Sequence, residues 1–252
     1  MCNSGNLYTL RLLASLLSSN SGNLQWADLH GANLQQANLQ GANLQQANLQ
    51  WADLQWAELQ NTDLRNANLE RANLEKANLE KAKLQKSNLR GANLCYANLR
   101  SANLHGANLY LFTKLYYANL RYTDLSSANL QEANLEKANL QKSNLSKANL
   151  YRAYLACANL DLANLGYANL NFACLRAANL RGANLHGANL REANLHGANL
   201  RDVEIQHANL QGACYNDQHI SVSGLEIPPT QFPDDFDPLK WGMLLNNALS
   251  EK

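Results

Sequence analysis

The sequence predicts an all-β repeat protein in which the chain turns a corner within every five residues. Leu recurs at every fifth position from Leu24 to Leu109 and, after one extra residue, from Leu115 to Leu200. Ala stands two residues before most of these Leu residues, and Asn most often lies between the two. Leu, Asn and Ala number 50, 37 and 36 in a chain of 252 residues, a bias that is foreign to ordinary globular enzymes.

A period of five fits neither a helix nor a flat strand. Five helical residues rotate by about 140°, which would scatter the Leu side chains, and five is an odd number of strand residues, which would alternate their faces. One buried core therefore needs a corner in every pentad. Within a pentad, Ala and Leu then point inward, while Asn points outward, where its side chain can bond local backbone groups. The two remaining residues occupy outward corner positions, and successive coils stack about 4.8 Å apart.

The Ala-Asn-Leu-Xaa-Xaa pattern, as in residues 32–36, resembles the pentapeptide-repeat family over about residues 22–220. The resemblance implies a right-handed quadrilateral β-helix, in which four pentads form one coil, and it gives about ten coils. Such a repeat cannot stand alone, so its terminal coils need caps.

Residues 1–21 precede the repeat and are expected to form a short N-terminal helical cap, because Leu7, Leu10, Leu13 and Leu17 fall on one side of a helix. A signal peptide is the alternative, but no basic segment precedes these residues and Arg11 interrupts them. It remains open whether this segment is a cap or a targeting segment.

Residues 221–252 hold all four Pro residues and resemble the C-terminal tails of cyanobacterial family members. We expect an irregular cap over the last coil, which would shield its strand edges. A homodimer contact through this tail is the alternative.

The repeat has one break, at Tyr110-Leu111-Phe112, where three residues stand in place of two. A bulge explains one extra residue. Family members that protect DNA gyrase carry longer loops, which one residue cannot make.

No catalytic, metal or cofactor site is predicted. The five cysteines, Cys2, Cys95, Cys157, Cys174 and Cys214, lack the paired spacing of a zinc site, and their odd number favours a reducing, cytoplasmic location. No His lies at a spacing that suggests a nucleophile and its base, and no glycine loop would bind phosphate. No apolar run reaches the roughly 18 residues of a membrane span.

The charges nearly cancel, with 21 Lys and Arg against 20 Asp and Glu. Cations cluster in two rings around the repeat, each flanked by glutamates. The first ring is Arg71, Lys76, Lys81 and Lys86, and the second is Lys137, Lys142, Lys147 and Arg152. We interpret the rings as mixed, solvated surface, because a nucleic-acid site would favour a basic stripe along the repeat. Nucleic acid is therefore not the expected partner.

Outward aromatic residues are the candidate partner-binding surface, and they are Trp26, Trp51, Trp56, Tyr96, Tyr116, Tyr117 and Tyr122. With four pentads per coil, Trp56, Lys76, Tyr96 and Tyr117 fall one above another on one edge. Stacking that stiffens the coils is one interpretation, and an exposed surface for a partner is the other.

The sequence therefore predicts a non-enzymatic solenoid that presents its surface to an unknown protein partner. The resemblance supplies the alternative, a mimic of DNA that binds and protects DNA gyrase. Residues 22–220 carry 18 Lys and Arg against 15 Asp and Glu, whereas a DNA mimic needs a negative surface.

Overall fold

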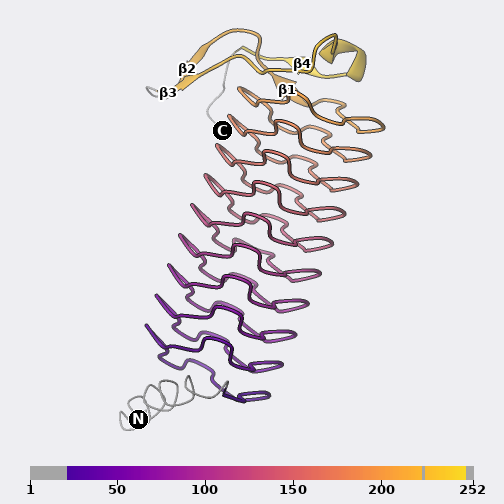
Figure 1. Ribbon diagram of the computed structural model, residues 1–252. Helices are drawn as coiled ribbons and strands as arrows, with labels where there is room; N and C mark the ends of the chain where they lie inside the picture. The colour runs from indigo at the N-terminus through magenta and orange to yellow at the C-terminus, as the bar shows by residue number, and fades with distance from the viewer. Residues whose placement is uncertain (1–21, 223–224, 248–252) are drawn as a thin grey trace.

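The structure is a computed structural model that describes residues 22–222 and 225–247. Its repeat forms a rod of stacked coils, and the C-terminal tail crosses the end of the rod that lies far from the first coil (Figure 1). The helical cap expected in residues 1–21 lies outside the described residues.

Parallel bridges between the central residues of the pentads hold neighbouring coils together. They join residues 20 apart before the break, as in Asn23 with Asn43, and residues 21 apart across it, as in Asn93 with Lys114. Twenty residues are four pentads, so each coil has four sides. Each side pairs through a single residue, because a corner follows at once.

The corners are hydrogen-bonded turns. The Ala27 N–H donates to the Leu24 carbonyl at 3.0 Å, and the same bond recurs in later pentads. The second corner residue has a left-handed backbone, with φ of 65° at Trp26 and 57° at Lys76. Type II turns need this conformation at their third residue. Most of these positions nevertheless carry side chains other than glycine.

The core consists of stacked Leu side chains and the Ala side chains beside them. Leu74 and Ala72 are fully buried, as are their counterparts in other interior coils. Burial of each Leu contributes roughly 1.5–3 kcal/mol. Thr or Ser replaces Ala at a few positions, where the hydroxyl donates to a backbone carbonyl, as Thr62 does to Leu39 at 2.9 Å.

The outward Asn side chains join each corner to the neighbouring coil. Asn88 Oδ1 accepts the Arg90 N–H at 3.3 Å, and Asn88 Nδ2 donates to Asn68 Oδ1 at 3.1 Å. The first bond confirms the expected local role of Asn, while the second forms a ladder between coils.

The break is accommodated at a corner. Leu111 and Phe112 both have a left-handed backbone, with φ of 60° and 57°. The Thr113 hydroxyl donates to the Leu89 carbonyl at 3.0 Å and lies 3.1 Å from the Gly91 N–H, which donates to it. The bridges continue on both sides of the break, so later pentads keep their sides.

Within the described residues, the strands longer than one residue lie at the end of the repeat and in the tail. These are β1 (Cys214–Tyr215), β2 (Ile220–Val222), β3 (Leu225–Ile227) and β4 (Leu244–Leu245), with a 3-10 helix at Pro238–Trp241. Strand β4 pairs in parallel with β1, and β2 pairs antiparallel with β3. Gln231 bridges to Asn199, so the tail extends two of the four sides, one through Gln231 alone and the other through both residues of β4.

Buried polar groups fix this tail on the last coils. Asn216 accepts the Gly197 N–H at 2.7 Å and donates to the Pro228 carbonyl at 2.7 Å. His196 Nε2 contacts the Asn246 carbonyl oxygen at 2.7 Å. Phe232, Phe236 and Trp241 stack in succession and pack against the repeat core.

Candidate functional site

The four-sided register divides the corner residues between two opposite faces. Each face consists of one side of the rod and the two corners that flank it. We call one of them the aromatic face, and its stacked strips are residues 50–56, 70–76, 90–96, 110–117, 131–137, 151–157 and 171–177. It carries most of the outward aromatic side chains of the repeat: Trp51, Trp56, Tyr96, Tyr110, Phe112, Tyr116, Tyr117, Tyr151, Tyr154 and Phe172.

Three tyrosines form a cluster at the middle of the aromatic face. Tyr96 stacks on Tyr117 with ring centroids 5.3 Å apart, and Tyr116 packs edge-on against both rings. The Lys137 ammonium lies 5.5 and 5.4 Å from the Tyr116 and Tyr117 rings and 3.4 Å from the Tyr116 hydroxyl. That hydroxyl and then the hydroxyl of Tyr117 raise the pKa of Lys137, which therefore stays charged.

Cations cover both tryptophans of this face. The Lys76 ammonium lies 4.4 Å from the centroid of the Trp56 ring, and the Arg71 guanidinium lies 4.7 Å from that of Trp51. Each contact contributes about 0.5–1 kcal/mol at an exposed site. These tryptophans thus have partners within the rod, which favours the stiffening role for them.

Among the described residues, Phe112 and Tyr154 are the rings of this face that are both exposed and without a ring or cation partner, since Tyr110, which also has no such partner, is half-buried. They are 60% and 50% exposed, and neither has an aromatic or cationic partner in the described part of the chain. Together with Lys114, Glu132 and Asn134 they line an open cavity of about 270 Å³. The cavity thus combines two uncovered rings with one charge of each sign.

A second aromatic group lies farther along the same face. Tyr151 and Phe172 meet edge to face at 5.9 Å, and the Arg152 guanidinium lies 5.2 and 5.7 Å from their rings. Exposed aromatic side chains therefore occur from Tyr96 to Phe172, in two groups that the polar strip at residues 131–137 separates.

The structure brings together five of the seven predicted aromatic residues and separates the other two. Trp51, Trp56, Tyr96, Tyr116 and Tyr117 lie on the aromatic face. Trp26 and Tyr122 lie on the opposite face, where the cations of Arg100, Arg121 and Lys142 surround the Tyr122 ring at 5.5–5.9 Å. The expected column of Trp56, Lys76, Tyr96 and Tyr117 is present, but Lys76 contacts only Trp56 among these rings.

Sequence reasoning missed Phe112, Tyr154 and Phe172. Two of them carried a signal, because Phe112 belongs to the break and Tyr154 replaces Asn at the centre of a pentad. Phe172 is an ordinary corner residue, and its role depends on its neighbours in adjacent coils.

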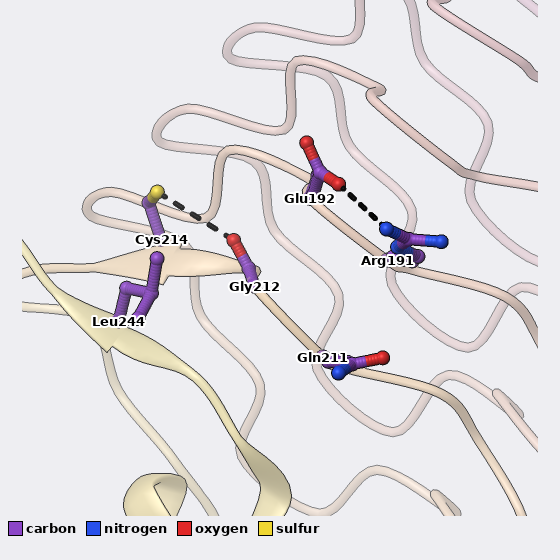
Figure 2. A pocket seen from close by; sticks show the side chains of 6 residues that line it. All are labelled: Arg191, Glu192, Gln211, Gly212, Cys214 and Leu244. Atoms are coloured by element: carbon purple, nitrogen blue, oxygen red, sulfur yellow. Dashed lines mark hydrogen bonds and ion pairs between the residues drawn. The ribbon is translucent and has the colours of Figure 1, made fainter.

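A larger cavity, of about 420 Å³, lies where β4 meets the last coils (Figure 2). Arg191 and Glu192 form an ion pair at 3.2 Å on its wall, and the Cys214 Sγ contacts the Gly212 carbonyl at 3.8 Å. Burial, followed by the Glu192 charge, raises the pKa of Cys214. The sulfur is therefore a protonated thiol at neutral pH, and a thiol is a poor nucleophile and metal ligand.

The described residues offer no candidate for a metal site or for a membrane span. No three side chains of His, Cys, Asp or Glu come together there as a metal site would require. None of the helical segments described by the structure has the length and apolarity of a membrane span.

Comparison with protein families matches pentapeptide repeats, in eight copies, over residues 23–61, 52–91, 72–109, 112–146, 143–182 and 178–214. A search of curated proteins gives no match. Among solved structures, HetL, a pentapeptide repeat protein involved in heterocyst differentiation regulation from the cyanobacterium Nostoc sp. strain PCC 7120, is 40% identical to this chain. That match covers 76% of this chain and 84% of HetL, with a TM-score of 0.43.

Two other solved structures are more distant. A pentapeptide repeat protein from the Arabidopsis thaliana thylakoid lumen is 33% identical over 39% of this chain and 68% of its own, with a TM-score of 0.38. QnrB1, a plasmid-mediated fluoroquinolone resistance protein, is 14% identical over 89% of this chain and 84% of its own, with a TM-score of 0.42. Pentapeptide repeat proteins are right-handed quadrilateral β-helices, which agrees with the four-pentad coils described above.

Proposed function

The chain belongs to the pentapeptide-repeat family, and from this premise we propose that it is a non-enzymatic solenoid that binds a protein partner through its aromatic face. We further infer about ten coils, the last of which is closed by the described part of the tail, at residues 225–247. The cysteines of the described chain are free, which supports a reducing, cytoplasmic location.

The concentration of outward aromatic side chains on one face carries this proposal. Aromatic anchors in the middle of an apolar patch supply most of the binding energy in protein interfaces. Phe112 and Tyr154 fit that role, because their rings are exposed and have no partner within the rod. The covered rings around them, from Tyr96 to Phe172, would hold this centre rigid.

A double variant, Phe112→Gln with Tyr154→Gln, tests the proposal. We expect it to lose the proteins that the wild type retains from an extract of the source organism, as measured by quantitative mass spectrometry. Its melting temperature should stay within about 2 °C, because exposed side chains without partners contribute little to stability. Trp26→Gln is the matched control, since Trp26 is 67% exposed on the opposite face and should keep full retention. Equal retention by all three proteins would reject the aromatic face as the binding surface.

Self-association through the tail is the alternative contact. Leu239, Leu244 and Leu245 are 66%, 56% and 48% exposed there. Light scattering distinguishes the two, because a tail dimer would dissociate in a variant with Leu244→Gln and Leu245→Gln, while the aromatic-face variant would not affect it.

A further inference from the structure

The face opposite the aromatic face is strongly basic along part of the rod. Its strips at residues 80–86, 100–106, 121–127 and 141–147 stack directly, through bridges from Lys83 to Asn103, Asp124 and Asn144 in turn. We call these four strips the basic face. They span three coil spacings, or about 14 Å.

The basic face collects a large share of the positive charge of the chain. Its cations are Lys81, Lys83, Lys86, Arg100, Arg121, Lys142 and Lys147, and its carboxylates are Glu80 and Asp124. Seven cations against two carboxylates give a net charge of +5, whereas the whole chain has +1. The other glutamates of the two charge rings, Glu70, Glu75, Glu132 and Glu136, lie on the aromatic face.

Although the charge of Lys83 acts on Asp63 in the preceding coil, most of these cations form no ion pair in the described part of the chain. Arg100 pairs with Glu80 at 3.7 Å, and the other six cations form no ion pair there. All seven side chains are exposed except that of Arg121, which is half-buried. The cations of the two charge rings are therefore divided equally between the faces, whereas four of the five glutamates that flank them lie on the aromatic face, because the 20-residue register directs alternate corner pairs to opposite faces.

The chemistry of the basic face fits phosphate better than protein. Lys is depleted from the centres of protein interfaces, which rely on apolar and aromatic anchors. Here Lys predominates, and the serine hydroxyls of Ser101, Ser126, Ser127 and Ser146 lie among the cations. Cations and hydroxyls are the groups that contact nucleic-acid backbones.

We propose that the basic face binds the phosphate backbone of double-stranded nucleic acid without selecting a sequence. Single-strand binders stack bases on aromatic side chains. The basic face offers only Tyr122, and three cations already lie around its ring. A duplex presents phosphates and keeps its bases inside, which matches a flat face of cations.

Fluorescence anisotropy with a labelled DNA duplex of about 20 base pairs tests this proposal, starting at about 50 mM salt. If five to seven cations contact phosphates, the logarithm of the association constant should fall with the logarithm of salt concentration with a slope of about −4 to −6. A variant with Lys81, Lys142 and Lys147 replaced by Gln should reduce the magnitude of that slope by about 2 to 3.

The matched control replaces Lys76, Lys114 and Lys137 by Gln, which removes the same charge from the aromatic face. It should keep the wild-type slope, and circular dichroism checks that both variants are folded. Equal loss in the two variants would show an effect of bulk charge and overturn the proposal, as would absence of salt-dependent binding by the wild type. Stronger binding to phosphatidylserine vesicles or to polyglutamate at equal charge would overturn it in favour of a membrane or an acidic protein. These outcomes do not test binding by the aromatic face. The variant that tests that face, Phe112→Gln with Tyr154→Gln, keeps every cation of the basic face.

Discussion

At the scale of single residues, each position of the pentad has its own physical requirement. The inward Leu fills the axis of the rod, and the inward Ala must be small because the tube is narrow. The second corner residue must adopt a left-handed backbone whatever its side chain. These requirements explain why the inward positions vary little, while the outward positions, at the corners and at the pentad centres, carry the varied chemistry.

Substitutions at two inward positions and one outward position should separate these roles. Leu74→Ala should lower the free energy of unfolding by about 2–5 kcal/mol, because it leaves a cavity. Ala72→Phe should be at least as harmful through overpacking. Gln40→Ala should change little, because Gln40 is an exposed corner residue. Chemical denaturation measures all three, and similar effects at the three sites would contradict the inward and outward assignment.

The left-handed corner predicts a gain in stability. Lys147 has φ of 60°, a conformation that costs a residue with a Cβ about 1–2 kcal/mol and glycine far less. Lys147→Gly should therefore raise the free energy of unfolding, by about 0.5–1 kcal/mol after the entropy of glycine is counted. Ser146→Gly, one residue earlier in the same corner, has no left-handed backbone to relieve and should be destabilising. The opposite order of the two variants would reject the turn geometry.

At the scale of elements, the break and the tail are the two places where the repeat departs from its rule. At the break, an extra left-handed residue widens one corner and Thr113 fills the space beneath it. The tail does not have the repeat pattern, but its backbone still pairs with two sides of the last coils. Both departures depend on buried polar side chains for their hydrogen bonds.

Thr113 should be more important than other threonines at the Ala position. Its hydroxyl both donates to Leu89 and accepts from the Gly91 N–H, whereas the Thr62 hydroxyl only donates to Leu39. Thr113→Val should cost about 1–3 kcal/mol, because it removes two hydrogen bonds of about 0.5–1.5 kcal/mol each. The part-buried Gly91 N–H would keep the Tyr110 carbonyl as its acceptor, at 3.2 Å. Thr62→Val should cost less, and thermal unfolding compares the two. Equal melting temperatures would show that the hydroxyl does not support the bulge.

Docking of the tail should weaken in acid. Burial lowers the pKa of His196, and the charge of Arg176 adds to this, although the hydrogen bond to Asn246 opposes it. A folded-state pKa below the unfolded value means that His196 stabilises the docked tail above about pH 6.5 and that this contribution is lost as the pH falls further.

Hydrogen exchange measures this effect. The backbone N–H groups of Leu244 and Asn246 donate to Ala213 and Tyr215 at 2.8 Å. Their protection, taken relative to the Leu74 amide, should fall between about pH 7 and 5. His196→Gln should remove this pH dependence, because Gln does not titrate. A wild-type tail that is equally protected across the range would contradict the role of His196.

At the scale of the whole molecule, much of the fold could be predicted and less of the surface. The five-residue spacing of Leu24 and its successors requires corners, and the spacing alone predicts the inward column. Four-sidedness came from the family resemblance, because no count of pentads shows where a coil closes. Side-chain contacts such as that of Lys76 with Trp56 could not be predicted, because they depend on rotamers. The pairing of Gln231 with Asn199 could not be predicted either, because the tail has no repeat that would fix its register.

The charge distribution of the rod predicts a negative result with DNA gyrase. A mimic of DNA must present phosphate-like negative charge, whereas this rod has a face of net charge +5 and an aromatic face with cations among its rings. The purified protein should therefore not inhibit supercoiling by gyrase at concentrations where acidic relatives do. Inhibition at such concentrations would revive the mimic interpretation. A control with added DNA duplex would exclude the other cause of inhibition, which is binding of the gyrase substrate DNA by the basic face.

The corner that holds the extra residue has a consequence for how such a rod can change length. Tyr96 and Tyr117 stack across the break although 21 residues separate them instead of 20. Single residues gained at a corner therefore leave every later side chain above the same neighbours, whereas a gain or loss of one pentad would rotate all later corners by a quarter turn. The two faces are therefore preserved when whole coils or single corner residues are gained or lost. They are not preserved when a single pentad is gained or lost.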